Sequence, residues 1–243
     1  MQWVRRAKDQ HPSAQDNRRV QVRGGHMVAA LYAWACERLY SELAWSYDWV
    51  AALVSGGRWP RWRRLALDYL TAQVTLELGS GPGHLLVEGA RAGWAMIGVD
   101  ASPVMVDIAG QRIRATRPTA AWQVAPTCVV GRGEAIPLPS RSVDQVVATF
   151  PAPYILAQAT LAECRRVLRE PDGKLVVVGL WVSADLPGLR SLPVFYGRPP
   201  DALLDSIVAR CAQEGLAATF HERVDGPFRI GVLVAHLIHS AMS

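Results

Sequence analysis

The chain has 243 residues, of which 50% are hydrophobic and 19% are charged. This content can fill a core, which argues against the disordered and fibrous classes of protein. No run approaches the roughly 18 to 20 consecutive apolar residues of a transmembrane helix, so no stable membrane insertion is expected. The length allows one large domain or two small ones.

The net charge of +5 comes mostly from the first 26 residues, which hold six basic and two acidic side chains. Without them, 20 basic and 19 acidic residues remain, so little favours nucleic acid as a partner. The same stretch is polar and has no hydrophobic periodicity. We expect a mobile basic arm over residues 1–26 and a single domain over residues 27–243.

The cysteines, Cys36, Cys128, Cys164 and Cys211, form no CxxC pair and no cluster with histidine. The first residues lack the apolar core and cleavage site of a secretory signal. We therefore expect a cytoplasmic protein with reduced thiols and no metal site.

Residues 27–70 are expected to form a helical cap. Apolar residues recur there at helical spacing, with a break at Gly56-Gly57. Aromatic residues are unusually dense in this stretch, which indicates core packing or a lid over a ligand pocket. The proline-rich and aromatic segment 181–200 is a second candidate for such a lid.

From residue 71 onward, short apolar runs alternate with helical patterns. The runs are near-continuous, which is typical of strands buried on both faces, and they lie at 74–78, 95–99, 127–130, 143–150 and 174–180. This alternation predicts an α/β fold with a doubly wound, mostly parallel sheet over residues 71–243. A helix at 203–216 and two strands around Asp225-Gly226-Pro227 predict an antiparallel C-terminal hairpin at one sheet edge.

The strongest chemical signal is LELGSGPGH at residues 76–84, where a predicted strand runs through three glycines into a helix. Glycines allow the backbone to approach a ligand closely, and the helix N-terminus offers unpaired N–H groups. The spacing is GxGxG and no Lys-Ser/Thr follows, which argues against NAD, FAD and ATP. Asp100 ends the next strand, where a carboxylate can accept both ribose hydroxyls. A nucleoside without a pyrophosphate is the simplest ligand.

With these motifs in this order, the chain resembles the class I S-adenosylmethionine-dependent methyltransferases over roughly residues 40–240. ELGSGPG is similar to that family's first motif, GVDASPVMVDIA to its second, and GEAIPLPSRSVDQVV to the segment leading into its fourth strand. ECRRVLREPDGKLVVVG looks like the helix and strand that follow. The resemblance implies a Rossmann-like seven-stranded sheet, S-adenosyl-L-methionine as cofactor and a small-molecule acceptor as substrate.

The resemblance also implies roles for individual residues. Those lining the methionine and ribose portion of the cofactor would be Glu77, Gly79, Ser80, Gly81 and Gly83, with Asp100 on the ribose hydroxyls. Those around the adenine would be Ala101, Ser102 and Met105 on its flanks and Gly133, Glu134 and Ala135 at its edge. Phe150 would face the sulfonium and the acceptor. Tyr47 would help to close the pocket.

Three local departures or likenesses bear on these roles. Many relatives have an adenine-binding aspartate where this chain has Arg132, which cannot accept a hydrogen bond, so Glu134, a backbone carbonyl or stacking must hold the adenine.

Residues 46–66 are similar to the entry segment of ubiquinone/menaquinone C-methyltransferases, yet residues 149–154 (TFPAPY) lack the Arg-Asn pair of those enzymes. PAPY is also similar to the (Asp/Asn)-Pro-Pro-Tyr segment of amino-methyltransferases, although Pro151 supplies only a carbonyl.

These observations predict methyl transfer from S-adenosylmethionine to a small, hydrophobic or aromatic acceptor by in-line displacement. One alternative is an inactive cofactor-binding scaffold or sensor with the same fold, and a third hypothesis is a nicotinamide-dependent reductase. No residue identifies itself as a catalytic base, and His84 is interpreted as a surface residue at a helix N-terminus. The N-terminal helices leave open a lid, a homodimer contact or weak membrane docking.

Overall fold

The computed structural model describes residues 55–71, 74–122, 124–184 and 198–238. The predicted arm at 1–26 and most of the predicted helical cap lie outside these ranges. The helices are α3 (Trp59–Arg64), η2 (Leu65–Tyr69), α4 (His84–Arg91), α5 (Pro103–Ala115), η3 (Pro153–Leu156), α6 (Gln158–Val167) and α7 (Asp201–Gln213). The strands are β1 (Val74–Leu78), β2 (Ala95–Asp100), β3 (Thr127–Val130), β4 (Gln145–Thr149), β5 (Lys174–Ala184), β6 (Leu216–Asp225) and β7 (Phe228–Leu237).

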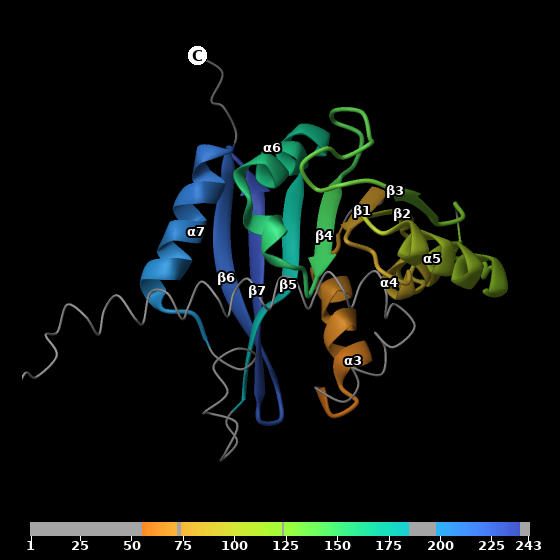
Figure 1. The fold of residues 1–243 in the computed structure, drawn as a ribbon, viewed down its shortest axis with the longest axis horizontal. Helices are drawn as coiled ribbons and strands as arrows, with labels where there is room; N and C mark the ends of the chain where they lie inside the picture. Colours follow the sequence, from red (N-terminus) through yellow and green to blue (C-terminus); the bar gives the residue numbers. More distant parts are fainter. Residues whose placement is uncertain (1–54, 72–73, 123, 185–197, 239–243) are drawn as a thin grey trace, which may run out of the picture.

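The described strands form one seven-stranded sheet in the order β3-β2-β1-β4-β5-β7-β6 (Figure 1). Strands β1 to β5 pair in parallel, whereas β7 lies antiparallel between β5 and β6. The doubly wound sheet and its antiparallel C-terminal hairpin are therefore confirmed. Leu76 pairs with Ile97 of β2 and Val146 of β4, which places the glycine loop after β1 at the centre of the sheet.

Helices cover both faces of the sheet and bury a separate apolar core on each (Figure 1). On one face, α6 and α7 contribute Leu161, Cys164 and Ile207 to the first core. On the other face, α3 and α4 contribute Trp62 and Leu85 to the second. This layering explains the continuous apolar runs of the central strands, because the side chains on both faces of each strand are buried in a core.

Two sequence-based expectations about strands are corrected. Residues 127–130 are not buried on both faces: β3 is an edge strand, and Val129 and Val130 are 39% and 51% exposed. Strand β5 extends to Ala184, beyond the predicted end at Leu180, because its far half pairs with β7 after an irregularity between Val178 and Val182. The apolar pattern alone could not identify the position of a strand in the sheet.

None of the described helices combines the length and the apolar composition needed to span a membrane. The longest of them, α5 and α7, have 13 residues each.

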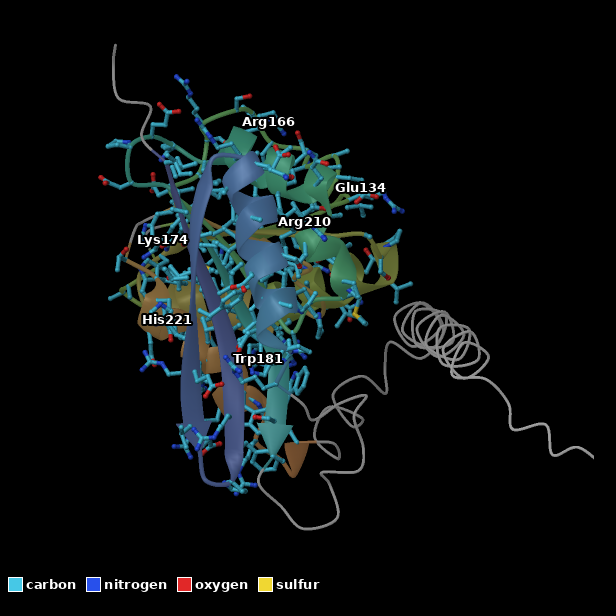
Figure 2. All side chains as sticks on the ribbon, turned by 90° about the vertical axis from the view of Figure 1, so that its left-hand side faces the viewer. Glu134, Arg166, Lys174, Trp181, Arg210 and His221 are labelled. Carbon is cyan, nitrogen blue, oxygen red and sulfur yellow. The ribbon has the colours of Figure 1, made fainter. Side chains whose placement is uncertain are left out.

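The long hairpin depends on close packing between a tryptophan and a glycine. Trp181 of β5 is 7% exposed, and its ring covers Gly231 of β7 so closely that a Cβ there would overlap the indole. Phe220 of β6 packs on the same ring, with 5.7 Å between ring centroids. Figure 2 shows Trp181 alongside the hairpin strands. Gly231 is thus required by packing, not by backbone conformation.

We expect Gly231→Ala to lower the free energy of unfolding by about 1–3 kcal/mol, because a methyl group must displace a buried ring. The matched control is Gly110→Ala in α5, where a Cβ would meet only the tip of the Arg114 side chain. The control should leave stability unchanged or raise it, because alanine favours a helix over glycine. Denaturant unfolding of both variants measures the difference, and equal stabilities would contradict this packing account.

Candidate functional site

The loop between β1 and α4 turns on three glycines in the left-handed region. Gly79, Gly81 and Gly83 have φ of 73°, 50° and 76°, which non-glycine residues adopt only with strain. The N–H groups of Gly79 and Ser80 both donate to the Val99 carbonyl of β2, at 2.8 and 3.2 Å. The loop is therefore fixed to the end of the neighbouring strand.

Each glycine has a different surrounding. A Cβ on Gly83 would lie 2.8 Å from the Cβ of Ala109, so this glycine allows α4 and α5 to pack closely. A Cβ on Gly81 would meet nothing within 4 Å, which leaves its backbone open to a ligand. Ser80 is buried, with its Oγ 3.2 Å from the Sγ of Cys128.

Asp100 connects the ends of β1 and β2. Its Oδ2 accepts from the Gly81 N–H at 2.7 Å and its Oδ1 from the Ser102 N–H at 2.9 Å. Burial raises the pKa of this carboxyl, while the two backbone N–H groups oppose the shift. Each carboxylate oxygen has a further lone pair, so both retain the capacity to accept from two adjacent hydroxyls.

A pocket opens over the carboxyl end of β1. Its lining consists of Trp59, Arg63, Glu77, Gly79, Ser80, Gly81, Pro82, His84 and Thr149. Three of the four predicted glycine-loop residues, Gly79, Ser80 and Gly81, therefore lie together with Glu77, whereas Gly83 and Asp100 are not part of the lining. His84, interpreted from the sequence as a surface residue, belongs to the lining as well.

An acidic and a basic residue, Glu77 and Arg63, both line this pocket. Glu77 is 1% exposed, and among the described residues its Oε2 has no hydrogen-bond partner. Burial raises the pKa of Glu77 well above its usual range, and Asp100 and Glu88 add to the rise, while the Arg63 guanidinium opposes it. Arg63 is 8% exposed and donates from Nη2 to Glu88 at 2.9 Å, whereas its Nε has no partner in the described part of the chain.

An acid and a base with unused polar atoms at one pocket fit a zwitterionic group. The Oε2 of Glu77 can accept from an ammonium group, and the Nε–H of Arg63 can donate to a carboxylate. Buried polar atoms normally have partners, so the unused atoms point to a ligand that supplies them. Sequence reasoning did not predict Arg63 as a site residue. An arginine within a helical pattern usually lies on a solvated face, so nothing in the sequence distinguished this one.

An aromatic wall adjoins the pocket. Trp59 lines it and stacks on Phe150, with 4.0 Å between ring centroids. Phe150 has a φ of 49°, an uncommon conformation for a bulky residue, and its ring lies directly over Gly179 of β5. Thr149, at the end of β4, lines the pocket beside this pair. Like Arg63, Trp59 lines the pocket but was not among the site residues predicted from the sequence.

Tyr154 lies between two of the predicted ligand-binding loops. Its Oη lies 2.5 Å from where a Cβ on Gly79 would stand, and its ring carbons lie 3.0 Å from a Cβ on Gly133. It comes from η3, which follows β4 directly. Both glycines are therefore required to accommodate this ring, and Tyr154 connects the glycine loop with the predicted adenine edge.

The predicted adenine edge is a tight turn at the rim. The Ala135 N–H donates to the Arg132 carbonyl at 3.1 Å, with Gly133 and Glu134 between them. Arg132 Nε donates to Glu134 Oε1 at 2.7 Å, and this contact together with the Glu134 backbone N–H lowers the pKa of Glu134. Figure 2 shows Glu134 at the periphery of the molecule. Ser102 is the N-cap of α5, and its Oγ accepts from the N–H of Met105, which is fully buried, while Ala101 before it is exposed.

Helix α6 fixes the segment that follows this turn. The Glu163 carboxylate accepts from the Ile136 N–H at 2.8 Å and from Arg166 Nε at 2.6 Å. Arg166 also donates to the carbonyls of Ile136 and Leu138, at 2.9 and 2.8 Å. These two side chains explain the charged pattern ECRR: they hold the loop that carries the predicted adenine edge.

Tyr47 lies outside the described residues. The other predicted site residues all lie at the carboxyl ends of β1 to β4 or directly after them, which is the usual ligand side of a doubly wound sheet.

Comparison with known proteins identifies the family. Residues 76–177 match the model of a methyltransferase domain. An uncharacterised methyltransferase of Mycobacterium bovis is 29% identical over 171 residues, which cover 68% of this chain and 65% of the relative. A ubiquinone/menaquinone biosynthesis C-methyltransferase of Geotalea uraniireducens is 30% identical over 152 residues, which cover 58% of this chain and 61% of the relative.

Solved structures agree on the fold. A SAM-dependent methyltransferase of Methanosarcina mazei superposes with a TM-score of 0.54 at 17% identity, covering 72% of this chain and 98% of that one. A geranyl diphosphate C-methyltransferase of Streptomyces coelicolor, solved with S-adenosyl-L-homocysteine, also gives 0.54, at 15% identity and 72% and 76% coverage. The domain match, the relatives and the fold together support a class I S-adenosylmethionine-dependent methyltransferase. The family prediction is confirmed.

The described residues fit the cofactor of this family. S-adenosylmethionine carries an amino-acid end, a ribose and an adenine. The pocket supplies the Glu77 and Arg63 pair, the Asp100 carboxylate supplies acceptors for a ribose, and the open backbone at Gly81 allows close approach. No phosphate-binding sequence is needed for such a ligand, in agreement with the GxGxG spacing.

We expect Asp100→Ala to weaken binding of S-adenosylhomocysteine by about 1.5–3 kcal/mol, because hydrogen bonds to a charged acceptor are lost. Calorimetric titration measures the effect, with thermal unfolding as the check that the variant folds. The control is Asp107→Ala, which removes an exposed carboxylate of α5, whereas Asp100 contacts the glycine loop at Gly81. Unchanged affinity in folded Asp100→Ala would contradict the assignment of this carboxylate to the ribose.

Glu77→Gln should stabilise the protein in the absence of ligand and weaken its binding of S-adenosylhomocysteine. The pKa of Glu77 is raised on folding, so the folded state binds the proton more tightly than the unfolded chain. The carboxylate therefore destabilises the protein increasingly as pH rises above the ordinary value of 4.5 toward the folded pKa. Glutamine has no such cost.

The difference in melting temperature between Glu77→Gln and the unmodified protein should thus grow in favour of the variant as pH rises above the ordinary glutamate pKa of 4.5. Thermal unfolding at a series of pH values measures it. Parallel melting curves at every pH would show that Glu77 is not a strained buried acid.

Proposed function

We propose that this protein transfers the methyl group of S-adenosylmethionine to a small, hydrophobic or aromatic acceptor. The observation that carries the proposal is that Glu77 and Arg63, both buried, line the same pocket as the glycine loop and each have one polar atom without a partner in the described part of the chain. A dinucleotide has no group with the charge pattern of an amino acid. A nicotinamide-dependent reductase has no use for this pair.

The nucleoside half of the ligand would lie toward Asp100 and the turn at Arg132–Ala135. Glu134 is bonded to Arg132 at the surface, so using its carboxylate for the adenine would require that ion pair to open. A backbone carbonyl needs no such rearrangement. Of the alternatives left open by the sequence, adenine binding by a carbonyl of this turn is therefore favoured.

The acceptor would bind beside Trp59 and Thr149. Methyl transfer occurs in line with the breaking bond, so the acceptor must lie opposite the departing sulfur. The face of the pocket formed by Trp59, stacked on Phe150, is apolar and flat and suits an aromatic or lipophilic molecule. The similarity to quinone C-methyltransferases supports the same class, although TFPAPY lacks their Arg-Asn pair.

When bound, the cofactor supplies a methyl group made electrophilic by a positive sulfur. Glu77, Arg63 and Asp100 would hold its two ends and so fix the direction of the methyl group. Trp59 and Phe150 would exclude water and confine the acceptor to the line of attack. Positioning of this kind can supply roughly 7–11 kcal/mol of the barrier without a dedicated base.

The test is turnover of methyl-labelled S-adenosylmethionine with a panel of phenols, quinone precursors and lipophilic amines. We expect release of S-adenosylhomocysteine that depends on one acceptor class. Trp59→Ala should lower kcat/KM for that acceptor at least about tenfold, because most of its apolar contact is removed. The control is Trp122→Ala, which lies outside the pocket lining. Cofactor binding without turnover across the panel would favour the scaffold alternative.

A further inference from the structure

Helix α3 supplies two residues of the pocket but has little stability of its own. It contains six residues, carries no acidic residue in its first turn and, among the described residues, is capped at its N-terminus only by the Ser55 Oγ, which accepts from the Trp59 N–H at 2.9 Å. A helix of this length is not stable by itself in water. The positions of Trp59 and Arg63 therefore depend on what holds α3 against the rest of the molecule.

One such contact is made by an acid at the far end of the chain. Asp225 ends β6 at the tip of the C-terminal hairpin, and its side chain is 12% exposed. Its Oδ2 accepts from the Trp62 Nε1–H at 2.8 Å, and its Oδ1 lies 3.0 Å from Arg61 Nη1. Arg58, directly before the helix, lies 3.6 Å from the same carboxylate. One carboxylate thus contacts three residues at α3.

The hairpin turn adds apolar contacts to this polar one. Phe228, at the start of β7, packs on Trp62 with 5.0 Å between ring centroids, and the Arg58 guanidinium lies 5.3 Å from the centroid of the Phe228 ring. Trp62 is 1% exposed, so its indole N–H depends on Asp225 for a partner. Figure 1 shows α3 beside the part of the hairpin that extends past the end of β4.

We propose that Asp225 is a positioning residue for cofactor binding, acting through α3 to hold the Arg63 guanidinium at the pocket. Arg63 follows Trp62 directly in the helix, and its Nη2 donates to Glu88 of α4. The hairpin tip and α4 therefore both hold α3 in place. The inference rests on the proposed function, since it assumes that Arg63 receives the amino-acid end of the cofactor.

The test compares two ligands that differ only at that end. S-adenosylhomocysteine carries the amino acid, whereas 5′-methylthioadenosine has the same nucleoside and sulfur without it. In calorimetric titrations of the full chain, Asp225→Ala should weaken S-adenosylhomocysteine at least about tenfold and methylthioadenosine less than about threefold. Asp225→Glu, which retains the carboxylate, should restore most of the loss.

The matched control is Glu222→Ala in the same strand. Its carboxylate lies near Arg198 and Arg229, at 3.5 and 3.8 Å, and its ion pairs within the described residues involve neither Arg58 nor Arg61. Both ligands should bind this variant as they bind the unmodified protein. Should Asp225→Ala fail to fold, Asp225→Asn keeps an acceptor for Trp62 while removing the charge that faces Arg58 and Arg61. This variant should also lose more affinity for S-adenosylhomocysteine than for methylthioadenosine, by a smaller factor than Asp225→Ala.

The outcomes separate the two proposals. Equal weakening of both ligands by the Asp225 variants would overturn the positioning role, because damage to the fold in general affects both. Unchanged affinity for S-adenosylhomocysteine would overturn it as well. If the unmodified protein binds neither ligand, the proposed function itself fails, and this inference fails with it.

Discussion

A buried carboxylate at the end of the central strand is the constraint around which this site is organised. Glu77 lies in β1 between two apolar cores, where a charge is costly unless it is paired. The described chain provides one nearby cation, Arg63, while leaving polar atoms of both side chains without partners. An apolar residue at this position would stabilise the fold more than a buried carboxyl group does. We therefore interpret Glu77 and Arg63 as residues whose unfavourable burial serves the binding of a zwitterion.

The remaining parts of the site follow from that arrangement. Asp100 ties the glycine loop to the end of β2 and retains acceptors for a ribose. Arg63 comes from α3, a short helix that needs support from α4 and from the hairpin tip at Asp225. Segments separated by more than 160 residues in sequence therefore meet at α3, the helix that supplies Trp59 and Arg63 to the pocket. The C-terminal hairpin contributes to the site as well as to the sheet.

Sequence reasoning predicted the fold well, because buried parallel strands and the glycine motif leave local signals. The doubly wound, mostly parallel sheet and its antiparallel C-terminal hairpin are confirmed. The edge position of β3 could not be predicted, since an apolar run looks alike in the middle and at the edge of a sheet. The roles of Asp100, the glycines and the adenine edge remain predictions that the geometry supports.

The residues that sequence reasoning missed have no local signal. Arg63 and Trp59 resemble ordinary members of an amphipathic helix, and only tertiary packing directs them to the pocket. Asp225 reads as part of a turn, and its contact with Trp62 joins positions that no periodicity connects. Tyr154 was noted as part of PAPY, but its proximity to Gly79 and Gly133 depends on how η3 folds back over the glycine loop.

The central claim is that the pocket at Glu77 and Arg63 recognises the amino-acid end of a nucleoside cofactor that has no pyrophosphate. The most direct test is calorimetric titration of the unmodified protein with S-adenosylhomocysteine, with NADH as the comparison ligand. The account predicts saturable binding of S-adenosylhomocysteine at one site per chain and no binding of NADH. Binding of NADH, or of neither ligand by folded protein, would contradict it.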